Sequence, residues 1–343
     1  MSDEAKTAER QTLEGHPAWI ISDGKAGHEM QCLGVAAALG MMPVIKRVAP
    51  TGLFKLASPW APVSPVEKFG AQATPFGPPW PALALATGRL TIPYVRALKR
   101  RAGLKTFTVI LLDPKTAANC ADLIWVPEHD RRRGPNVITT ATSPHAFTPQ
   151  RIAGLRATVP DAIAALPHTR VAVLIGGPNR DYKYAADDIG RLATALHVIG
   201  RSGAGLMITP SRRTPPAMMD AIAEATSDAE RIVWDGSGEN PYPSFLAHAD
   251  AFVVTADSVN MTCEAAATGR PIHVFTPAGT SPKFDRFHDS LRRAGVTRPL
   301  SDRSGPLAMW SYEPLDSAKT IAEEILRRWT IRSHILPGLV HHT

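Results

Sequence analysis

Glycines and polar side chains follow short apolar runs of this sequence, at the points where strands would end. The first such segment reads Ser-Asp-Gly-Lys-Ala-Gly-His-Glu over residues 22–29 and directly follows an apolar run. Gly24 and Gly27 permit a tight turn, and a helix that begins there would offer N–H groups to an anion. His28, at the start of that helix, could act as a general base. A simple glycine turn with a capping Ser or Asp explains the same residues, so both interpretations stay open.

Further polar groups lie in the first half of the chain. Arg89 follows Gly88 and opens another helix, where it could bind an anionic group or merely face solvent. Glu128, His129 and Asp130 stand in a row after an apolar run, which suggests acid–base chemistry or a metal site. Because neighbouring side chains of an extended chain alternate in direction, all three would not face one ion. We therefore expect no metal and take Glu128 or Asp130 as part of an acceptor site.

Two strand ends of the second half combine glycines, cations and hydroxyl groups. Residues 176–181 read Gly-Gly-Pro-Asn-Arg-Asp after one apolar run, and residues 211–214 read Ser-Arg-Arg-Thr after the next. A glycine turn with arginine and hydroxyl donors suits a phosphate or diphosphate. An exposed basic turn is the alternative for each segment alone, but the two segments together favour an anion site.

A fifth segment runs from Ala249 to Pro271. In it an apolar run leads into a hydroxyl-rich turn and a helix of small residues that carries Glu264. Ser258 or Thr262 at the helix start could hydrogen-bond phosphate oxygens together with backbone N–H groups, and Glu264 could accept two ribose hydroxyls. The alternative makes Ser258 an ordinary N-cap and Glu264 a surface residue.

Short runs rich in Val, Ile and Leu alternate with amphipathic stretches, which predicts parallel sheets flanked by helices. Strands are expected at 18–21, 44–48, 82–86, 106–112, 123–126, 137–140, 171–175, 205–209, 231–234, 251–255 and 272–275. Helices are expected at 29–39, 92–102, 185–199, 215–225, 258–268 and 317–329, and a helix and linker near 149–167 marks the boundary between the two halves. Each half is therefore an α/β unit of ordinary domain size. The Pro-rich stretch 50–81 shows little periodicity and predicts a long loop or an apolar surface contact.

The composition limits the classes of function. The chain has 343 residues, with 38 Lys+Arg, 31 Asp+Glu and a formal net charge of +7. The basic residues are dispersed, which favours a cationic surface over nucleic-acid binding and leaves phosphate-bearing ligands or a membrane surface open. Three cysteines are too few for a disulfide scaffold and fit a reducing, cytoplasmic compartment. We expect neither a signal peptide nor a membrane-spanning helix.

The fifth segment resembles the donor-nucleotide region of glycosyltransferases with two Rossmann domains, the GT-B type. The whole chain resembles the mitochondrial-fission protein family of plants, the elongated-mitochondria type, and its bacterial relatives. The matching motifs occur in the family's order at Asp23–Gln31, Thr87–Arg89, Pro127–Asp130, Gly134–Val137, Ile175–Pro178, Ser211–Pro215 and Gly238–Tyr242. At Lys25 such loops commonly carry Arg, a departure that keeps the charge.

This resemblance implies a GT-B-like α/β fold in which two Rossmann-type domains face each other across a cleft. The expected parts are a disordered tail over 1–15, an acceptor domain over 16–155, a donor domain over 156–315 and a C-terminal helix over 316–343 that packs back on the acceptor domain. The resemblance also implies metal-independent transfer from a nucleoside-diphosphate sugar, of the UDP or GDP type, to an unknown acceptor. A non-catalytic interaction scaffold and a sugar-nucleotide epimerase are the alternatives.

Residue patterns and resemblance together give three groups of candidate site residues. The catalytic candidates are His28, Glu128 and Asp130. The candidates for binding the acceptor are Gly24, Lys25, Gly27, Arg89 and Asn136. The candidates for binding the nucleotide are Gly176, Gly177, Asn179, Ser211, Arg212, Arg213, Glu239, Asn240, Tyr242, Ser258, Met261, Thr262 and Glu264.

No bound cofactor is expected besides the donor substrate. The acceptor is unassigned, and a lipid-linked molecule is one alternative, contacted by Trp60 and Trp80 of the stretch 50–81. The expected location is the cytoplasm, with peripheral contact to an anionic inner membrane face left open. No nucleic-acid partner is expected, and the oligomeric state stays undetermined.

Overall fold

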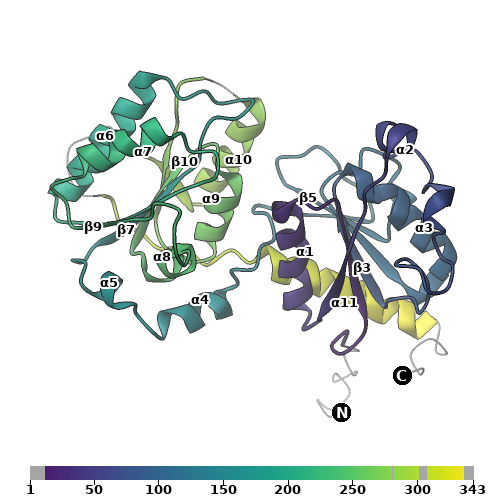
Figure 1. Cartoon of the computed structure of the whole chain (residues 1–343). Helices are drawn as coiled ribbons and strands as arrows, with labels where there is room; N and C mark the ends of the chain where they lie inside the picture. Colours follow the sequence, from purple (N-terminus) through teal and green to yellow (C-terminus); the bar gives the residue numbers. More distant parts are fainter. Residues whose placement is uncertain (1–11, 280, 301–306, 336–343) are drawn as a thin grey trace, which may run out of the picture. The chain divides into compact units, whose positions relative to one another are not determined.

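The computed structural model describes residues 12–279, 281–300 and 307–335 (Figure 1). The chain divides into two compact units. Unit 1 takes the chain up to Ala146 together with the part from Asp316 onward, and unit 2 takes Phe147–Leu315. The division falls before the expected boundary at residue 155, because helix α4 (Pro149–Arg156) belongs to unit 2.

Unit 1 is built on a six-stranded parallel sheet with the strand order β2-β1-β3-β4-β5-β6. The strands are β1 (Ala18–Ser22), β2 (Pro43–Arg47), β3 (Leu83–Thr87), β4 (Phe107–Leu111), β5 (Leu123–Pro127) and β6 (Val137–Thr140). β1, β3, β4 and β5 are buried along their whole length, as expected where helices cover both faces of a parallel sheet. All six confirm the predicted strands to within one residue at each end.

Side chains of unit 1 alternate between the two faces of its sheet. Ile20 lies in the core with α1 (Ala26–Ala38) and α11 (Ser317–Ile335), whereas Ile21 lies in the core with α3 (Ile92–Ala102). This alternation follows from the two-residue period of a strand. Both cores are built from the same continuous apolar runs that predict the strands.

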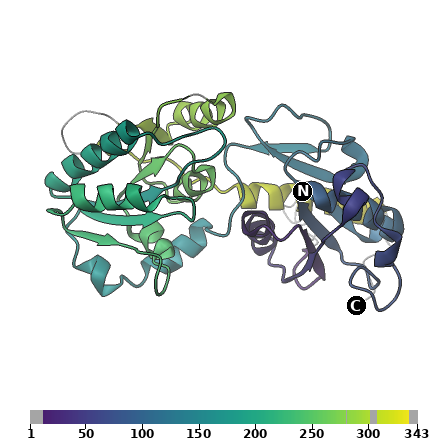
Figure 2. The same ribbon diagram turned by 45° about the horizontal axis from the view of Figure 1, so that its top comes forward.

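The C-terminal helix α11 completes the core of unit 1. Drawn in yellow, it lies beside α1 in both views (Figures 1 and 2). Ile321, Ala322 and Ile325 are buried in the core on this face. The Arg332 guanidinium adds an ion pair with the carboxylate of Asp122 at 2.9 Å. Residues from both ends of the chain therefore stabilise one unit.

Residues 12–15 belong to the fold, which corrects the expectation of a disordered tail over 1–15. Leu13 is fully buried in the core of unit 1, and its carbonyl oxygen accepts the N–H of His16 at 3.1 Å. The rest of that stretch, 1–11, lies outside the described residues.

The Pro-rich stretch 50–81 is more ordered than the sequence predicts. It holds α2 (Gly52–Leu56) and a 3₁₀ turn at Pro65–Glu67. The rings of Phe69 and Phe76 stack with their centroids 5.3 Å apart and are buried in the core beside α3. Clustered aromatic side chains, which carry no helical or strand period, fix this stretch to the unit.

Unit 2 is built on a second parallel sheet of six strands, in the order β12-β11-β10-β7-β8-β9. The strands are β7 (Arg170–Ile175), β8 (Gly205–Pro210), β9 (Arg231–Val233), β10 (Ala251–Thr255), β11 (Ile272–Phe275) and β12 (Thr297–Pro299). Counted from β7, this is the strand order of a Rossmann fold. The first five strands confirm the prediction, and β12 was not predicted.

Helices of unit 2 pack on both faces of this sheet. They are α4, α5 (Asp161–Ala164), α6 (Ala186–Arg201), α7 (Pro216–Ala225), α8 (Tyr242–His248), α9 (Val259–Ala266) and α10 (Pro282–Arg293). Figure 1 shows α6 and α7 side by side, and Leu192 and Ile222 from these helices share a core with Val173 of β7. The helices α8 and α10 were not predicted.

None of the helices in the described ranges is long and apolar enough to cross a membrane.

We expect Ile325→Ala on α11 to lower the free energy of unfolding by about 2–5 kcal/mol, because it leaves a cavity in the core of unit 1. Ile331→Ala makes the same chemical change on the same helix at a side chain that is 48% exposed. Its effect should stay within about 0.5 kcal/mol. Urea unfolding of both variants measures the difference, and equal effects would contradict the placement of α11 in the core.

Candidate functional site

In each sheet, the strands that follow the first strand of the unit are added first on one side of it and then on the other, so the strand order reverses there. In unit 2, β8 and β10 flank β7, and in unit 1, β2 and β3 flank β1. Ligands of open α/β sheets bind outside the carboxyl ends of the strands at such a reversal. The polar segments predicted from sequence follow β7, β8 and β10 in unit 2, and β1 and β3 in unit 1. The topology therefore gathers each set at one point of its own unit.

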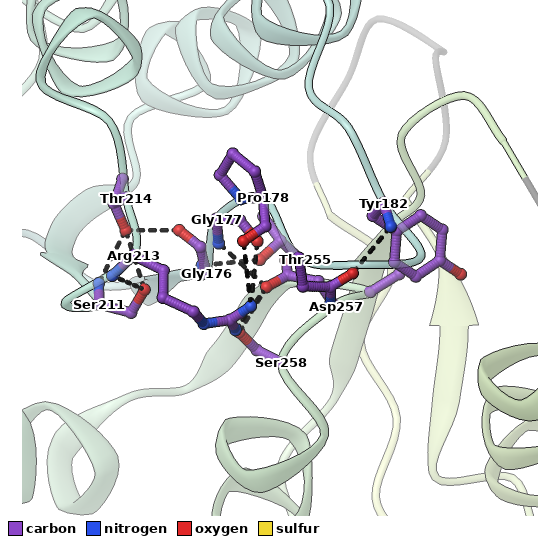
Figure 3. A network of polar contacts seen from close by, with 12 residues as sticks. Gly176, Gly177, Pro178, Tyr182, Ser211, Arg213, Thr214, Thr255, Asp257 and Ser258 are labelled. Carbon is purple, nitrogen blue, oxygen red and sulfur yellow. Dashed lines mark hydrogen bonds and ion pairs between the residues drawn. The ribbon is translucent and has the colours of Figure 1, made fainter. Parts of the chain in front are cut away.

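The carboxylate of Asp257 joins the ends of the three central strands of unit 2 (Figure 3). This fully buried side chain accepts the N–H of Gly177 at 2.9 Å and pairs with the Arg213 guanidinium at 2.8 Å. The hydroxyl of Tyr184 donates to its other oxygen at 2.6 Å. Burial and the charge of Asp257 raise the pKa of Tyr184, so the phenol remains a donor. Because Gly177 follows β7, Arg213 follows β8 and Asp257 follows β10, one carboxylate fixes three loops.

Position 176 requires glycine because Asp257 and Ser258 lie against its Cα. A Cβ there would come within 2.2 Å of an Asp257 carboxylate oxygen and 2.3 Å of the Ser258 hydroxyl oxygen. The N–H of Gly176 donates to the hydroxyl of Thr255 at 2.8 Å. The hydroxyl of Thr214 donates to the Gly176 carbonyl oxygen. Both neighbouring strand ends therefore hold the turn after β7 in one shape (Figure 3).

The two predicted arginines in the turn after β8 are placed differently. The N–H of Ser211 donates to the Thr214 hydroxyl at 2.8 Å, and the Ser211 hydroxyl accepts the N–H of Arg213 at 3.2 Å. The Arg213 guanidinium contacts Asp257 and also donates to the Gly177 carbonyl oxygen at 3.2 Å. Arg212 is exposed and forms no ion pair with a described residue. Arg213 therefore shapes the turn, and Arg212 keeps its charge for a ligand.

Helix α9 begins at Ser258, beside the turn at Gly176. No described side chain caps its first N–H groups, and the buried Ser258 hydroxyl instead lies 3.4 Å from an Asp257 oxygen. The buried Thr262 donates its hydroxyl back to the Ser258 carbonyl oxygen at 3.0 Å, and Met261 is half-buried. The first N–H groups of a helix carry partial positive charge and attract anions. The start of α9 can therefore hold an anion.

Glu264 on α9 accepts a hydrogen bond from the hydroxyl of Tyr242, the first residue of α8. The Tyr242 ring packs edge-on against Phe147 with centroids 5.8 Å apart, and the Arg151 guanidinium lies 4.6 Å from the Phe147 centroid. Burial raises the pKa of Glu264 to about 7, although the Tyr242 hydroxyl and the Arg151 charge act to lower it. A carboxylate has two oxygens, so one can still accept a ligand hydroxyl.

The remaining nucleotide candidates shape loops or lie at the surface. Asn179 accepts the N–H of Tyr182 at 2.8 Å through its side-chain oxygen. Asn240 accepts the N–H of Tyr242 at 3.0 Å in the same way, next to the start of α8. Asparagines that bond the nearby backbone are typical of turns, so both have a structural role here. Glu239 is exposed.

Asp23 and His28 form a pair at the carboxyl end of β1. The buried Asp23 carboxylate is 2.9 Å from His28 Nδ1 and 2.6 Å from the Lys25 ammonium. Burial alone would raise the pKa of Asp23, but hydrogen bonds from Lys25 and His28 outweigh it and lower the pKa. The His28 side chain stays 22% exposed. A carboxylate that holds one ring nitrogen leaves the other able to take a proton, as a general base must.

The end of β3 closes the other side of this pair. Gly88 has a φ of +94°, and a Cβ there would come within 2.8 Å of Asp23 and 2.9 Å of His28. The hydroxyl of Thr87 is buried and has no hydrogen-bond partner among the described residues. The start of α1 at Lys25 likewise has no side-chain cap. The uncapped N–H groups at the start of α1 are available to an anionic or polar ligand beside His28.

Gly24 and Gly27 lie in the loop and first turn that lead into α1. The N–H of Gly24 donates to the Ser22 hydroxyl at 2.9 Å, which closes the turn after β1. Gly27 is the second residue of α1 and is exposed. Both therefore border the Asp23–His28 pair.

Four other candidates of unit 1 form no hydrogen bond or ion pair with Asp23 or His28 among the described residues. Arg89 donates to the carbonyl oxygens of Leu56, at the end of α2, and of Ser58, and the Asn136 amide donates to two backbone carbonyl groups before β5. Both have structural contacts where the sequence predicts ligand contacts. Glu128 is exposed and Asp130 half-buried, and both follow β5, three strands from β1. That separation is about 14 Å across the sheet, so the structure does not bring them to His28.

Sequence reasoning did not assign Asp257, Tyr184 and Asp23, on which the two sites depend. Asp23 directly follows β1 and Asp257 follows β10 by two residues, in both cases at a strand-order reversal. An aspartate at the carboxyl end of a strand beside such a reversal is a sequence signal from which Asp23 and Asp257 could have been predicted. Tyr184 lies in a loop where no sequence pattern marks it.

Among the described residues, no three His, Cys, Asp or Glu side chains are grouped so as to hold a metal ion. Cys32, Cys120 and Cys263 are buried thiols, and burial raises the pKa of Cys120.

We expect Gly176→Ala to destabilise the protein by about 1–3 kcal/mol, because the new methyl group collides with the fixed carboxylate of Asp257. Gly190 provides the control, since it lies inside α6 and nothing approaches its Cβ position within 4 Å. Gly190→Ala should stabilise the protein by up to about 1 kcal/mol. Calorimetric unfolding of both variants measures the effect, and matching shifts of Tm would refute the close packing at Gly176.

The pKa of Glu264 predicts a pH-dependent contribution to stability. Its value of about 7 lies above the ordinary 4.5, so between these pH values the folded state holds a proton that the unfolded state releases. Stability from this group is therefore full below pH 4.5 and is lost as pH rises to about 7, by an amount on the order of 1–3 kcal/mol.

Glu264→Gln should remove this fall in stability, while the amide still accepts the Tyr242 hydroxyl. Unfolding free energies measured from pH 4.5 to 8 test the expectation against the wild type. Glu323→Gln, the same change at an exposed position of α11, is the control. Parallel pH curves for the wild type and Glu264→Gln would mean that Glu264 titrates alike in both states.

Comparison with known proteins places the chain in a family. The model of the family described as Mitochondrial fission ELM1 matches residues 26–329. The chain is 30% identical over 282 residues to "Mitochondrial fission protein ELM1" of Arabidopsis thaliana, a match that covers 74% of this chain and 66% of the plant protein. It is 27% identical over 348 residues to "Uncharacterized protein RP120" of Rickettsia prowazekii (strain Madrid E), which covers 90% of this chain and 97% of that protein. The chain thus spans just under two thirds of the plant relative.

The fold has a counterpart among solved structures. The UDP-GlcNAc 2-epimerase from Methanocaldococcus jannaschii matches with a TM-score of 0.51 and 10% identity, over 92% of this chain and 99% of that chain. At this identity the likeness shows the fold alone, which is GT-B-like, as the motifs predict. Because the family model matches nearly the whole described chain, the protein belongs to the mitochondrial fission ELM1 family.

Proposed function

We propose that this protein binds a nucleoside-diphosphate sugar on unit 2 and transfers the sugar to an acceptor bound by unit 1. The uncapped start of α9 beside the fixed turn at Gly176 carries the proposal. It lies where a Rossmann-type sheet reverses its strand order. Such a place binds nucleotide phosphates in other proteins, because helix N–H groups point at the ligand. The proposed donors are of the UDP or GDP type.

Fixed donors are proposed to stabilise the diphosphate as it leaves. The N–H groups at the start of α9 and the exposed guanidinium of Arg212 supply positive charge. The contact of Arg213 with Asp257 keeps the loop shape constant during the reaction. Donors that are already in position need no reorganisation when negative charge develops. Sugar transfer is therefore proposed to use these groups in the place of a divalent cation.

Glu264 is proposed to hold the ribose. One of its carboxylate oxygens accepts the Tyr242 hydroxyl, which orients the side chain. The second oxygen can accept ribose hydroxyls when the carboxylate is ionised. Burial of Glu264 strengthens such a hydrogen bond, because less water competes for it.

His28 is proposed as the general base in unit 1. It would take the proton of an acceptor hydroxyl as the acceptor oxygen bonds to the anomeric carbon and the bond from that carbon to the diphosphate breaks. Asp23 would hold Nδ1–H and stabilise the imidazolium that forms. Lys25 and the start of α1 could hold an anionic group of the acceptor. Glu128 and Asp130 stay as the other candidate bases.

Two alternatives follow from the relatives. The similar fold from Methanocaldococcus jannaschii is a 2-epimerase, which acts on a sugar nucleotide. The name of the Arabidopsis relative fits a non-catalytic scaffold for fission machinery. A scaffold has no need of an uncapped helix start beside a glycine turn at both sheet reversals, so the transferase is preferred. The proposed location is the cytoplasm.

We expect one class of nucleoside diphosphate to raise the Tm of the wild type and to leave Glu264→Ala unchanged. Uridine, guanosine, adenosine, cytidine and thymidine diphosphates and their sugars would be compared by thermal shift and calorimetry. A ligand at 100 times its Kd adds about 2.7 kcal/mol to stability, which such scans detect. Glu323→Ala is the matched control and should respond like the wild type.

The outcomes separate the three functions. The transferase would be supported if the bound donor is consumed only when an acceptor extract is added, and if His28→Ala abolishes this consumption. Turnover of the sugar nucleotide alone would support the epimerase. Absence of binding across the panel would remove both enzymes and leave the scaffold.

A further inference from the structure

Unit 1 exposes three large apolar side chains on α2 and the turn that follows it. Leu53 is 80% exposed, Leu56 74% and Trp60 65%. No residue of α2 is buried, and Leu53 and Leu56, three residues apart, share one face of the helix. A short helix without a buried residue adds little to the core. Its apolar side chains therefore call for an explanation other than folding.

The fold holds this segment in place. Arg89 donates to the carbonyl oxygens of Ser58 at 2.8 Å and of Leu56, the last residue of α2, at 3.3 Å. Arg96 of α3 donates to the carbonyl oxygens of Pro59 and Trp60, at 3.0 and 3.3 Å. Hydrogen bonds from a guanidinium are stronger than those between neutral groups. The exposed apolar side chains are thus presented by a supported backbone.

The charged residues in the surrounding stretch of sequence are almost all basic. Residues 30–112 contain one acidic residue, Glu67, whose carboxylate accepts the Tyr94 hydroxyl at 2.5 Å. The ten basic residues of this stretch are Lys46, Arg47, Lys55, Lys68, Arg89, Arg96, Lys99, Arg100, Arg101 and Lys105. Carboxylates outside the stretch pair with Arg47 and Lys99. Most of the positive charge is therefore uncompensated by a paired carboxylate.

We propose that α2 and the turn after it dock on an anionic phospholipid bilayer, with Leu53, Leu56 and Trp60 entering the headgroup boundary. Apolar side chains and nearby cations each contribute to such binding, the first by burial and the second by attraction to anionic lipids. Tryptophan suits the headgroup region because its ring is apolar and its N–H is polar. This attachment does not depend on the proposed sugar transfer.

Trp80 is not part of the docking surface, which corrects the sequence expectation for this pair of tryptophans. Its ring packs edge-on against Trp19, with the centroids 6.2 Å apart, and it is half-buried against the core beside α3. Only Trp60 of the two is exposed enough to enter a bilayer.

The charge of this surface separates the bilayer from other occupants. Exposed apolar patches on soluble proteins often mark protein contacts. A second copy of this chain, placed face to face, would bring two sets of Lys55, Arg89 and Arg96 together, and these cations repel. An anionic bilayer offers both the apolar interior and the opposite charge.

Co-sedimentation of the full chain with vesicles tests the proposal. Vesicles of phosphatidylcholine alone should bind little protein, whereas an equal mixture with phosphatidylglycerol should bind most of it and release it at high salt. The double variant Leu53→Ser/Trp60→Ser should lower the partition coefficient by about tenfold or more. Lys55→Glu should also lower it and weaken its dependence on salt.

Controls make the test specific. Met309→Ser and Ile331→Ser remove exposed apolar side chains elsewhere and should bind like the wild type. An unchanged Tm for each variant shows that it is folded. Wild-type binding by Leu53→Ser/Trp60→Ser, or equal binding to both kinds of vesicle, overturns the proposal. A third outcome also overturns it: vesicles bind no protein, and the protein forms a dimer in solution that Trp60→Ser dissociates. The surface would then be covered by a second copy of the chain.

Discussion

A buried carboxylate must be paired with hydrogen-bond donors or cations, and the partners that Asp257 requires determine the shape of the site in unit 2. An unpaired buried charge costs on the order of several kcal/mol, so each partner of Asp257 must be in place for unit 2 to be stable. Those partners are the Gly177 N–H, the Tyr184 hydroxyl and the Arg213 guanidinium. Groups of these kinds could bind a phosphate themselves. Because Asp257 occupies them, the proposed anion binding relies on the start of α9 and on Arg212, which Asp257 does not contact.

Unit 1 has a buried aspartate at the corresponding point of its own sheet, but with different partners. Asp23 contacts the Lys25 ammonium and the His28 imidazole, whereas Asp257 contacts a backbone N–H, a phenol and a guanidinium. An imidazole held by a carboxylate can gain and lose a proton. The first arrangement therefore suits proton transfer, and the second suits a rigid binding loop. The same strand-end chemistry supports two tasks because the partners differ.

The sequence predicted every described strand whose burial is continuous, whereas the elements it missed are short or mostly exposed. β7 is an apolar run, but β12 has three residues, two of them exposed, and α10 buries only two of its twelve. Residue types at strand ends predicted both candidate sites and did not reveal every role. Arg89 and Asn136 donate to backbone carbonyl groups, a structural role that the sequence did not reveal. Which carbonyl group lacks a partner depends on the folded chain, so no local pattern encodes it.

The segment Thr87–Arg89 connects the candidate base of unit 1 to its exposed apolar helix. Gly88 packs against Asp23 and His28, and Arg89 holds the backbone just after α2. Thr87 adds a buried hydroxyl without a described partner. Gly88 and Arg89 thus tie the proposed docking surface to the proposed acceptor site through one strand end. If α2 docks on a bilayer, this strand end ties the proposed docking surface to the Asp23–His28 pair within unit 1, so an acceptor carried by that bilayer would suit the proposed site.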